Sequence, residues 1–340
     1  MIEIDGSFGE GGGQIVRTSL TLSLATGKPF RIFNIRAARK RGGLLKQHLT
    51  AVRAAAELSR AEIQGAELHS RELTFTPNEV QPGDYRFSVG TAGSATLVLQ
   101  TVLPVLLTVD KPSTLTLEGG THNPLAPPFE FLQKTFIPLI GRMGPVVSAQ
   151  LDRPRYYPHG GGQFHVTVHP SSQLARLELL ERGQIRGMRA SAIVSQLPRH
   201  IAERELKVLA RKLPSKPTRL KVVEETRSPG PGNVVLIEIE TDQVTEVIAA
   251  FGAQGIPAEK VATQAAKEAA DYLAAKVPVG RHLANQLLGP LALGSGGSYR
   301  TMSPTEHTTT NATVIQKFLN VQIDSTPETQ STWRIDVGKS

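Results

Sequence analysis

The chain has 340 residues, 39% hydrophobic and 20% charged. The length suggests two domains, or one repeated domain with an insertion. The composition is typical of a folded protein and argues against disorder. The chain contains no cysteine, which excludes disulfides, thiolate zinc sites and a cysteine nucleophile. Its net charge of +8 favours a polyanionic partner.

The N-terminal residues show no basic segment followed by an apolar run, so we expect no signal peptide. The longest apolar stretch, 97–109, is interrupted by Gln100 and Pro104 and is too short to cross a bilayer. We therefore expect a cytoplasmic protein with no membrane partner.

The first part of the chain predicts one α/β unit. A glycine-rich turn, 11–13, precedes a helix over 15–25 and an apolar strand over 30–35. A second helix with Leu45, Leu49, Val52 and Ala56 on one face leads to a strand over 72–76.

A block of basic residues spans 31–53 in this unit and contains no acidic residue. Its cations are Arg31, Arg36, Arg39, Lys40, Arg41, Lys46 and Arg53, accompanied by His48. The block fits either a polyanion-binding surface or an ordinary solvated face. Aromatic residues make up only 5% of the chain, so contacts to phosphates are expected rather than stacking on bases.

The same pattern returns twice. The second unit predicts a helix over 92–108, a strand over 113–118, a glycine turn at 119–120, a helix over 128–143 and a strand over 146–151. The third predicts helices over 258–276 and 283–293, a strand before residue 307, a helix over 311–319 and a strand over 333–337. We therefore expect three repeats of one α/β unit.

The segment 182–255 differs in character and predicts a small inserted α/β domain. Its expected order is a strand over 187–194, a helix over 199–213, a strand over 219–225, a turn at 228–233, a strand over 234–240 and a helix near 244–250. The large domain would then comprise 1–181 and 256–340.

His307 lies in a run of small hydroxyl and amide residues, 303–311, with no second histidine, no cysteine and no carboxylate cluster to form a metal site. A neutral imidazole can attack phosphorus if an acceptor holds its other nitrogen. Taken alone, the segment fits a capped loop histidine at least as well as a nucleophile.

Several separate motifs resemble the RNA 3′-terminal phosphate cyclase family, in the family's order. The similarity extends from residue 2 to about residue 337. The motifs are EGGGQIVR (10–17), GGLLKQHLTA (42–51), GTAGSATLVLQTVLP (90–104), GGTHNPLAPP (119–128), GPGN (230–233) and HTTTN (307–311). The resemblance implies an α/β (α+β) fold: three repeats of a two-helix, four-stranded unit form a large domain, and a small α/β domain is inserted.

The resemblance also implies a three-step reaction. ATP adenylylates His307 and releases pyrophosphate, AMP passes to an RNA 3′-phosphate, and the neighbouring 2′-OH expels AMP to form a 2′,3′-cyclic phosphate. ATP, Mg²⁺ or Mn²⁺, and an RNA with a 3′-phosphate end are thus the expected partners. Asn311 and the threonines of the HTTTN motif are expected to orient the imidazole.

Other residues take expected roles by their match to the family motifs. Glu10 is the metal-associated carboxylate. The residues expected to contact the nucleotide are Gln100, Pro127, His282, Leu283, Ala284, Asn285 and Gln286. The residues expected to handle the RNA phosphate are Arg17, Arg36, Arg39, Gln47 and His48. Without the resemblance, each has an ordinary structural explanation, such as a surface cation or a core amide.

The chain departs from the family pattern at three positions. His282 stands where the family usually has tyrosine, and Asn285 and His122 each stand where it has aspartate. We expect these changes to tune nucleotide affinity or metal preference. Two alternatives remain open: a cyclase-like scaffold without catalysis, and an enolpyruvyl transferase built on the same kind of repeat. The sequence indicates neither an oligomeric state nor the physiological RNA.

Overall fold

The first repeat comprises a four-stranded sheet and two helices. The structure is a computed structural model and describes residues 1–339. The elements are β1 (Ile2–Asp5), α1 (Gly13–Thr26), β2 (Phe30–Phe33), α2 (Lys46–Ser59), β3 (Glu62–Gln64) and β4 (Leu73–Thr76). The strand order is β1-β2-β4-β3, with β1 parallel to β2 and the other pairs antiparallel.

The second repeat has the same topology, with the strand order β5-β6-β8-β7. Its strands are β5 (Asp84–Ser88), β6 (Ser113–Gly119), β7 (Val146–Arg153) and β8 (Gly162–His169). Its first helix is α3 (Ala95–Leu106). The second is a continuous helical segment built from α4 (Phe129–Phe131), the π-helical turn η1 (Leu132–Phe136) and α5 (Ile137–Gly141).

The third repeat is split by the inserted unit. Its elements are β9 (Leu177–Leu179), α8 (Arg281–Leu293), β14 (Gly297–Thr301), α9 (Glu306–Phe318), β15 (Val321–Pro327) and β16 (Trp333–Lys339). The strand order β9-β14-β16-β15 again places the first strand parallel to the second. The three shared topologies confirm the α/β fold with repeated units.

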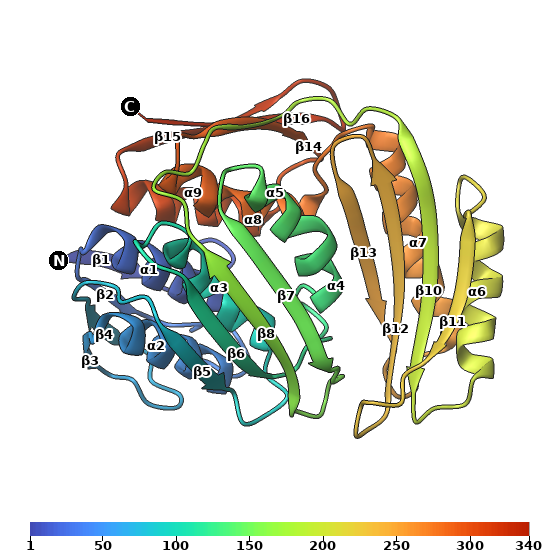
Figure 1. The fold of residues 1–340 in the computed structure, drawn as a ribbon, viewed down its shortest axis with the longest axis horizontal. Coiled ribbons are helices and arrows are strands. Elements are labelled where there is room, and N and C mark those ends of the chain that lie inside the picture. The colour runs from blue at the N-terminus through green and yellow to red at the C-terminus, as the bar shows by residue number, and fades with distance from the viewer. Residues whose placement is uncertain (340) are drawn as a thin grey trace.

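The three sheets surround helices that pack on one another (Figure 1). Helix α1 contacts α2, α3 and α9, and α8 contacts α3 and α9. One apolar core joins the inner faces of the sheets to these helices. The close packing brings segments hundreds of residues apart into contact, because each repeat contributes its helices to the same interior. Among residues 1–339, no helix combines the length and apolarity that crossing a membrane requires.

The inserted unit lies beside the second repeat in Figure 1 and has its own sheet, in the order β11-β10-β12-β13. Its elements are β10 (Ile185–Ser195), α6 (His200–Lys212), β11 (Arg219–Glu224), β12 (Gly232–Thr241), β13 (Thr245–Phe251) and α7 (Ala258–Ala275). Helices α6 and α7 pack on one face of the sheet to form a second core. Residues of the opposite face, such as Val234 and Leu236, join the core of the large unit.

The predicted helix near 244–250 is wrong, because this segment forms strand β13. Val247 pairs with Glu238 of β12 in antiparallel register. Val247 packs in the large core and Ile248 in the small one. Since both faces of the strand are buried, the alternation of apolar and polar residues that marks a strand is missing. Helix α7, which the sequence placed within 256–340, packs on the small sheet. The domain boundaries themselves stay a prediction.

Glu246 of β13 connects the small sheet to the start of α8. Its carboxylate is 3% exposed and accepts a hydrogen bond from the backbone N–H of Gly280, at 3.3 Å. Gly280 is the N-cap of α8, and a Cβ there would lie 2.5 Å from Glu246 Oε1. Burial raises the pKa of the Glu246 carboxyl from 4.5 to about 8, and the nearby charge of Glu268 adds to this effect.

Replacing Glu246 with glutamine is expected to make the stability of the protein less sensitive to pH. The folded state holds a proton on Glu246 more tightly than the unfolded state does, so the wild type loses stability as pH rises from 4.5 to 8. Over that window the loss is at most about 5 kcal/mol. The melting temperature of Glu246→Gln minus that of the wild type should therefore increase between pH 5 and pH 8.5. A difference that stays constant with pH would contradict this, and Glu240→Gln, an exposed carboxylate on β12, is the control.

Candidate active site

His307 lies in the first turn of α9, which begins earlier than the sequence predicted. The expected helix starts at residue 311, whereas α9 starts at Glu306. Thr305 is the N-cap, and its hydroxyl accepts a hydrogen bond from the N–H of Thr308 at 3.3 Å. Threonine is a weak helix former but a good cap, so the hydroxyl-rich run resembled a loop. The histidine is therefore held by a helix terminus and not by a free loop.

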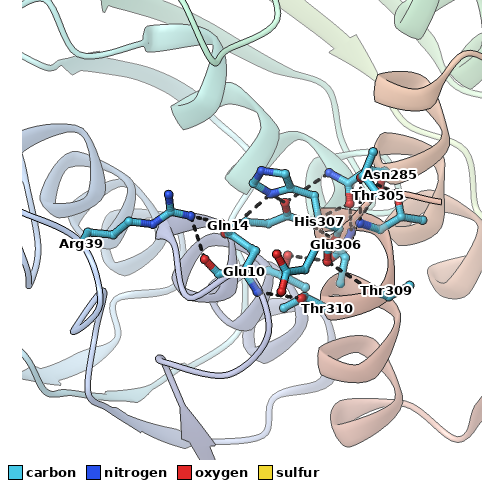
Figure 2. Close-up of polar contacts among 12 residues, drawn as sticks. Glu10, Gln14, Arg39, Asn285, Thr305, Glu306, His307, Thr309 and Thr310 are labelled. Carbon is cyan, nitrogen blue, oxygen red and sulfur yellow. Dashed lines mark hydrogen bonds and ion pairs between the residues drawn. The ribbon is translucent and has the colours of Figure 1, made fainter. Parts of the chain in front are cut away.

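The imidazole of His307 is oriented by Gln14 of α1 (Figure 2). His307 Nδ1 lies 3.0 Å from Gln14 Oε1. Gln14 Nε2 donates to Asn285 Oδ1 at 2.8 Å and to the His307 carbonyl at 3.3 Å, which turns the amide oxygen toward the ring. Since an amide oxygen only accepts, Nδ1 carries the proton in the neutral ring and Nε2 keeps its lone pair. The side chain is 55% exposed, so Nε2 is accessible to a substrate.

A chain of amides holds Gln14 in place. Asn285 of α8 also accepts a hydrogen bond at Oδ1 from Asn311 Nδ2, at 3.0 Å. Asn311 Oδ1 in turn accepts from the hydroxyl of Thr18 at 2.7 Å. The network joins α1, α8 and α9 and fixes the donor and acceptor ends of each amide. Asn311 thus supports the site from behind, and its hydrogen bonds do not reach the imidazole as the sequence analysis expected.

Glu10 lies beside the histidine at the end of the glycine-rich turn. Its side chain is 4% exposed, and Oε1 lies 3.6 Å from His307 Nδ1. Oε2 accepts a hydrogen bond from Arg39 Nη2 at 2.6 Å. Oε1 is buried and has no hydrogen-bond partner among residues 1–339. One carboxylate oxygen is therefore free to bind a cation or a donor brought by a ligand.

Glycines allow the turn to approach its neighbours. Gly9 has a φ of +56°, and a Cβ there would overlap the hydroxyl of Thr310. That hydroxyl accepts a hydrogen bond from the N–H of Glu10 at 3.1 Å. A Cβ on Gly13 would overlap the imidazole of His48. The turn thus packs directly against α9 on one side and α2 on the other, which only glycine permits.

The first turns of α1, α2 and α3 lie against one another near this turn. His48, at the start of α2, touches the first residue of α1, and Gln47 Oε1 accepts from the N–H of Ser94, the N-cap of α3, at 3.0 Å. Helix α1 has no side-chain cap. The free N–H groups and the positive ends of the helix dipoles favour an anion here.

His48 is 3% exposed, and its Nδ1 accepts a hydrogen bond from the N–H of Leu45 at 3.1 Å. Burial lowers the pKa of His48 to about 3, and the charges of Arg17 and Arg36 act in the same direction. The ring is thus neutral near pH 7, so it can offer a phosphate an N–H donor but no charge.

The predicted phosphate arginines differ in how the protein already uses them. Arg17 is half-buried and makes no ion pair among residues 1–339. Burial lowers its pKa to about 10, so it stays charged. Arg36 Nη1 donates to the carbonyls of Arg41 and Gly43 and shapes the basic loop. Arg39 is 48% exposed, and within residues 1–339 only the Nη2 of its guanidinium is engaged, by Glu10.

The residues predicted to bind the nucleotide differ in their burial and in their partners. Gln100 of α3 and Gln286 of α8 are hydrogen-bonded to each other, and the carbonyl of Pro127 accepts from Thr96 of α3 at 2.9 Å. His282 is 67% exposed and lies 3.1 Å from Glu268. Leu283 and Ala284 are buried in the core, so only their backbone could meet a ligand. The roles of all these residues stay predictions.

Two further residues of the sequence motifs, His122 and Asn233, are each hydrogen-bonded to a carboxylate. His122 is 1% exposed; its Nε2 lies 2.8 Å from Glu130 and its Nδ1 lies 2.8 Å from the Thr121 hydroxyl. Its hydrogen bonds are thus made away from His307. Asn233 of the GPGN motif donates to Glu205 of α6 at 2.9 Å inside the small core. Burial raises the pKa of Glu205 to about 7.

Gln14 is the functional candidate that the sequence analysis missed. The residue was visible in the glycine-rich motif at the start of a predicted helix, but nothing in the sequence placed it beside His307, 293 positions away. A large amide directly after three glycines was the available signal.

The fold and the site define a family. The family model described as "RNA 3′-terminal phosphate cyclase" matches residues 8–325. The chain belongs to the RNA 3′-terminal phosphate cyclase family.

Curated relatives agree over nearly the whole chain. The RNA 3′-terminal phosphate cyclase of Koribacter versatilis is 53% identical over 328 residues, which is 96% of this chain and 92% of that protein. The protein of the same name from Ectopseudomonas mendocina is 47% identical over 336 residues, 99% of this chain and 98% of that protein. The match thus includes all three repeats and the inserted unit.

Proposed function

We propose that the protein converts an RNA 3′-terminal phosphate to a 2′,3′-cyclic phosphodiester, using ATP and adenylylated His307. Membership of the cyclase family supports the overall reaction. The observation that carries the mechanism is the hydrogen bond between His307 Nδ1 and Gln14 Oε1, which leaves Nε2 unprotonated and accessible.

In the first step, Nε2 of His307 attacks the α-phosphorus of ATP. The N–P bond forms as the bond to the pyrophosphate oxygen breaks, and the positive charge that develops on the ring is shared with the Nδ1–H donated to Gln14. The nearby carboxylate of Glu10 stabilises that charge. The N-terminal turns of α1, α2 and α3 would hold the phosphates of ATP, and Arg17 would meet the phosphate of the RNA.

In the second step, an oxygen of the RNA 3′-phosphate attacks the same phosphorus and the N–P bond breaks, giving an RNA that ends in a 3′-to-5′ diphosphate linkage to adenosine. In the third step, the vicinal 2′-OH attacks the RNA phosphorus and AMP leaves. The anhydride supplies a better leaving group than oxide. The attack is intramolecular, so little orientational entropy remains to be lost.

The residues at Glu10 fit a divalent cation such as Mg²⁺ or Mn²⁺. Residues 1–339 contain no cluster of three or more metal-ligating side chains. A single carboxylate with a free buried oxygen is nonetheless what Mg²⁺ uses when substrate phosphates and waters complete its shell. Such an ion would neutralise phosphate charge beside His307, and Arg39 would hold the second oxygen of Glu10 in place.

Replacing Gln14 with leucine is expected to slow adenylylation of His307 by about 10- to 100-fold, the range found when a metal-binding histidine loses the hydrogen-bond partner that orients its ring. The ring would lose its acceptor and its preferred tautomer. Gln14→Glu keeps an acceptor for Nδ1–H but loses the donor to Asn285, so it should retain more activity. Single-turnover labelling with ATP at saturating concentration measures the step. Equal rates for wild type and Gln14→Leu would remove Gln14 from the mechanism.

Replacing Arg39 with alanine is expected to slow the transfer of AMP to RNA by about 10-fold. Adenylylation of the protein should be slowed less. The exposed part of its guanidinium can pair with a terminal phosphate, whereas Nη2 is held by Glu10. The two steps are measured separately, and the neighbouring exposed cation in Lys40→Ala is the control. Equal losses in both steps would show that Arg39 serves ATP or Glu10 instead.

A direct assay tests the whole proposal. The protein is incubated with ATP, Mg²⁺ and an RNA carrying a labelled 3′-phosphate, and the product is treated with phosphatase. A label that becomes resistant to phosphatase only when ATP is present supports cyclisation. No resistance, in a protein that binds RNA, would favour the scaffold. Release of phosphate from an enolpyruvyl donor would favour the transferase.

A further inference from the structure

The inserted unit carries a second basic segment without acidic residues. Residues 206–223 contain six cations and neither aspartate nor glutamate. They are Lys207, Arg211, Lys212, Lys216, Arg219 and Lys221, and all six are exposed. They extend from the second half of α6 through the connecting loop into β11. We call this set the α6–β11 basic surface.

The arginines elsewhere on the inserted unit's surface are neutralised. Arg186 pairs with Asp242, Arg189 with Glu240, Arg199 with Glu203 and Glu224, Arg204 with Glu259, and Arg227 with Glu225. In the part of the chain that the structure describes, none of the six cations of the α6–β11 basic surface forms an ion pair. Among the exposed arginines of this unit, Arg211 and Arg219 are thus the two without an ion pair in the described residues.

Neighbouring carboxylates are turned away or already occupied. Glu205 precedes the segment but is 0% exposed and is bonded to Asn233 inside the core. Glu224 ends β11 and is held by Arg199 at 2.7 Å. The positive potential of the surface is therefore not cancelled by adjacent side chains.

The local geometry presents these charges to a ligand. Lys207 and Arg211 are one helical turn apart on the exposed side of α6. β11 is an edge strand, and Arg219 and Lys221 stand on one face of it, in register with Arg189 and Ser191 of β10. Strand β11 lies at the outer side of the small sheet, next to α6 (Figure 1). Val222, next to Lys221, packs in the small core under α6, so Arg219 and Lys221 lie on the face of β11 that α6 does not cover. A strand of RNA that crosses the open edge of β11 can contact these two cations and the cations of α6.

We propose that the α6–β11 basic surface binds the sugar–phosphate backbone of RNA at a distance from its 3′ end, so that longer RNAs gain a second contact. This inference rests on the proposed function, in which the 3′ end itself lies at His307. Residues 206–223 include no aromatic side chain, so the contact is to phosphates and does not depend on sequence. The shortest substrates, which cannot reach this surface, gain nothing from it.

The test compares two variants that lose the same charge. The first combines Lys212→Gln, Lys216→Gln and Lys221→Gln. The control combines Lys111→Gln, Lys276→Gln and Lys317→Gln, three exposed lysines outside the segment. Binding of a fluorescent 20-nucleotide RNA with a 3′-OH end is measured by anisotropy at several KCl concentrations. Because this RNA lacks a 3′-phosphate, the binding result does not depend on whether cyclisation occurs.

We expect the first variant to bind at least about 10-fold more weakly. Its slope of log affinity against log salt should be shallower by about 2, as expected for three lost phosphate contacts on single-stranded RNA. The control should match the wild type. Cyclisation of a dinucleotide 3′-phosphate should be unchanged in both variants.

Three results would overturn the proposal. They are unchanged RNA affinity and salt slope in the first variant, equal weakening in both variants, and loss of dinucleotide cyclisation in the first variant alone. The last would mean that the substitutions act on the fold or the active site. If the wild type fails to cyclise the dinucleotide, the proposed function fails, while the binding comparison still decides the role of this surface.

Discussion

Replacing His307 with alanine is expected to reduce cyclisation of an RNA 3′-phosphate by at least about 10⁴-fold, the order of loss seen when a covalent nucleophile is removed. Within residues 1–339, His307 is the one histidine whose ring pairs with the Glu10 carboxylate and with the Gln14 amide oxygen. The measurement is phosphatase resistance of a labelled 3′ end under single-turnover conditions. Because His307 is 55% exposed and its contacts are few, the variant should fold normally.

The same variant offers an internal control. An RNA already carrying the 3′-to-5′ diphosphate linkage to adenosine bypasses the step that needs His307, so His307→Ala should still cyclise it at a measurable rate. Failure on both substrates, in a protein of normal stability, would assign His307 to RNA binding or to the last step instead. Cyclisation of the ordinary substrate at the wild-type rate would end the nucleophile hypothesis.

Replacing Glu10 with alanine is expected to lower the rate of adenylylation by about 10² to 10³-fold, the usual loss for a preorganised charge at the reacting centre. The substitution removes the free oxygen Oε1 and also releases Arg39 from Oε2. In a titration with Mg²⁺ or Mn²⁺, Glu10→Ala should need a higher metal concentration than the wild type to reach half of its maximal rate. The readout is the rate of protein labelling at each metal concentration.

Arg39→Ala separates the two effects of the Glu10 substitution. Both variants break the Glu10–Arg39 pair, but only Glu10→Ala removes the carboxylate. If the metal dependence of the two variants is the same, Glu10 acts through Arg39 and has no role with a metal. If only Glu10→Ala needs higher metal concentration, the assignment of Oε1 to the cation holds.

Much of the fold could be predicted because the sequence of each repeat shows the same order of strands and helices. The helices predicted over 15–25 and 283–293 match α1 (Gly13–Thr26) and α8 (Arg281–Leu293) of the first and third repeats. Short strands such as β3 (Glu62–Gln64) and β9 (Leu177–Leu179) carry too few residues to show a period. Strand β13 was misread as a helix because both of its faces are buried.

The site was predicted less completely than the fold. Glu10 and His307 were named from motifs, and the structure places them 3.6 Å apart. The role of Gln14 depends on a contact between the first and third repeats, which no local pattern reveals. His48 was expected to meet phosphate as a basic residue, but its burial and the lowered pKa that follows depend on the packing of α1 against α2.

The most direct test of the account is covalent labelling of the wild-type protein with ATP carrying label in the α-phosphate, in the presence of Mg²⁺ or Mn²⁺. We expect one AMP per chain, bound through an acid-labile, base-stable linkage and mapped by peptide mass to His307. A protein that cyclises RNA without ever carrying AMP, or that carries it on another residue, would contradict the account.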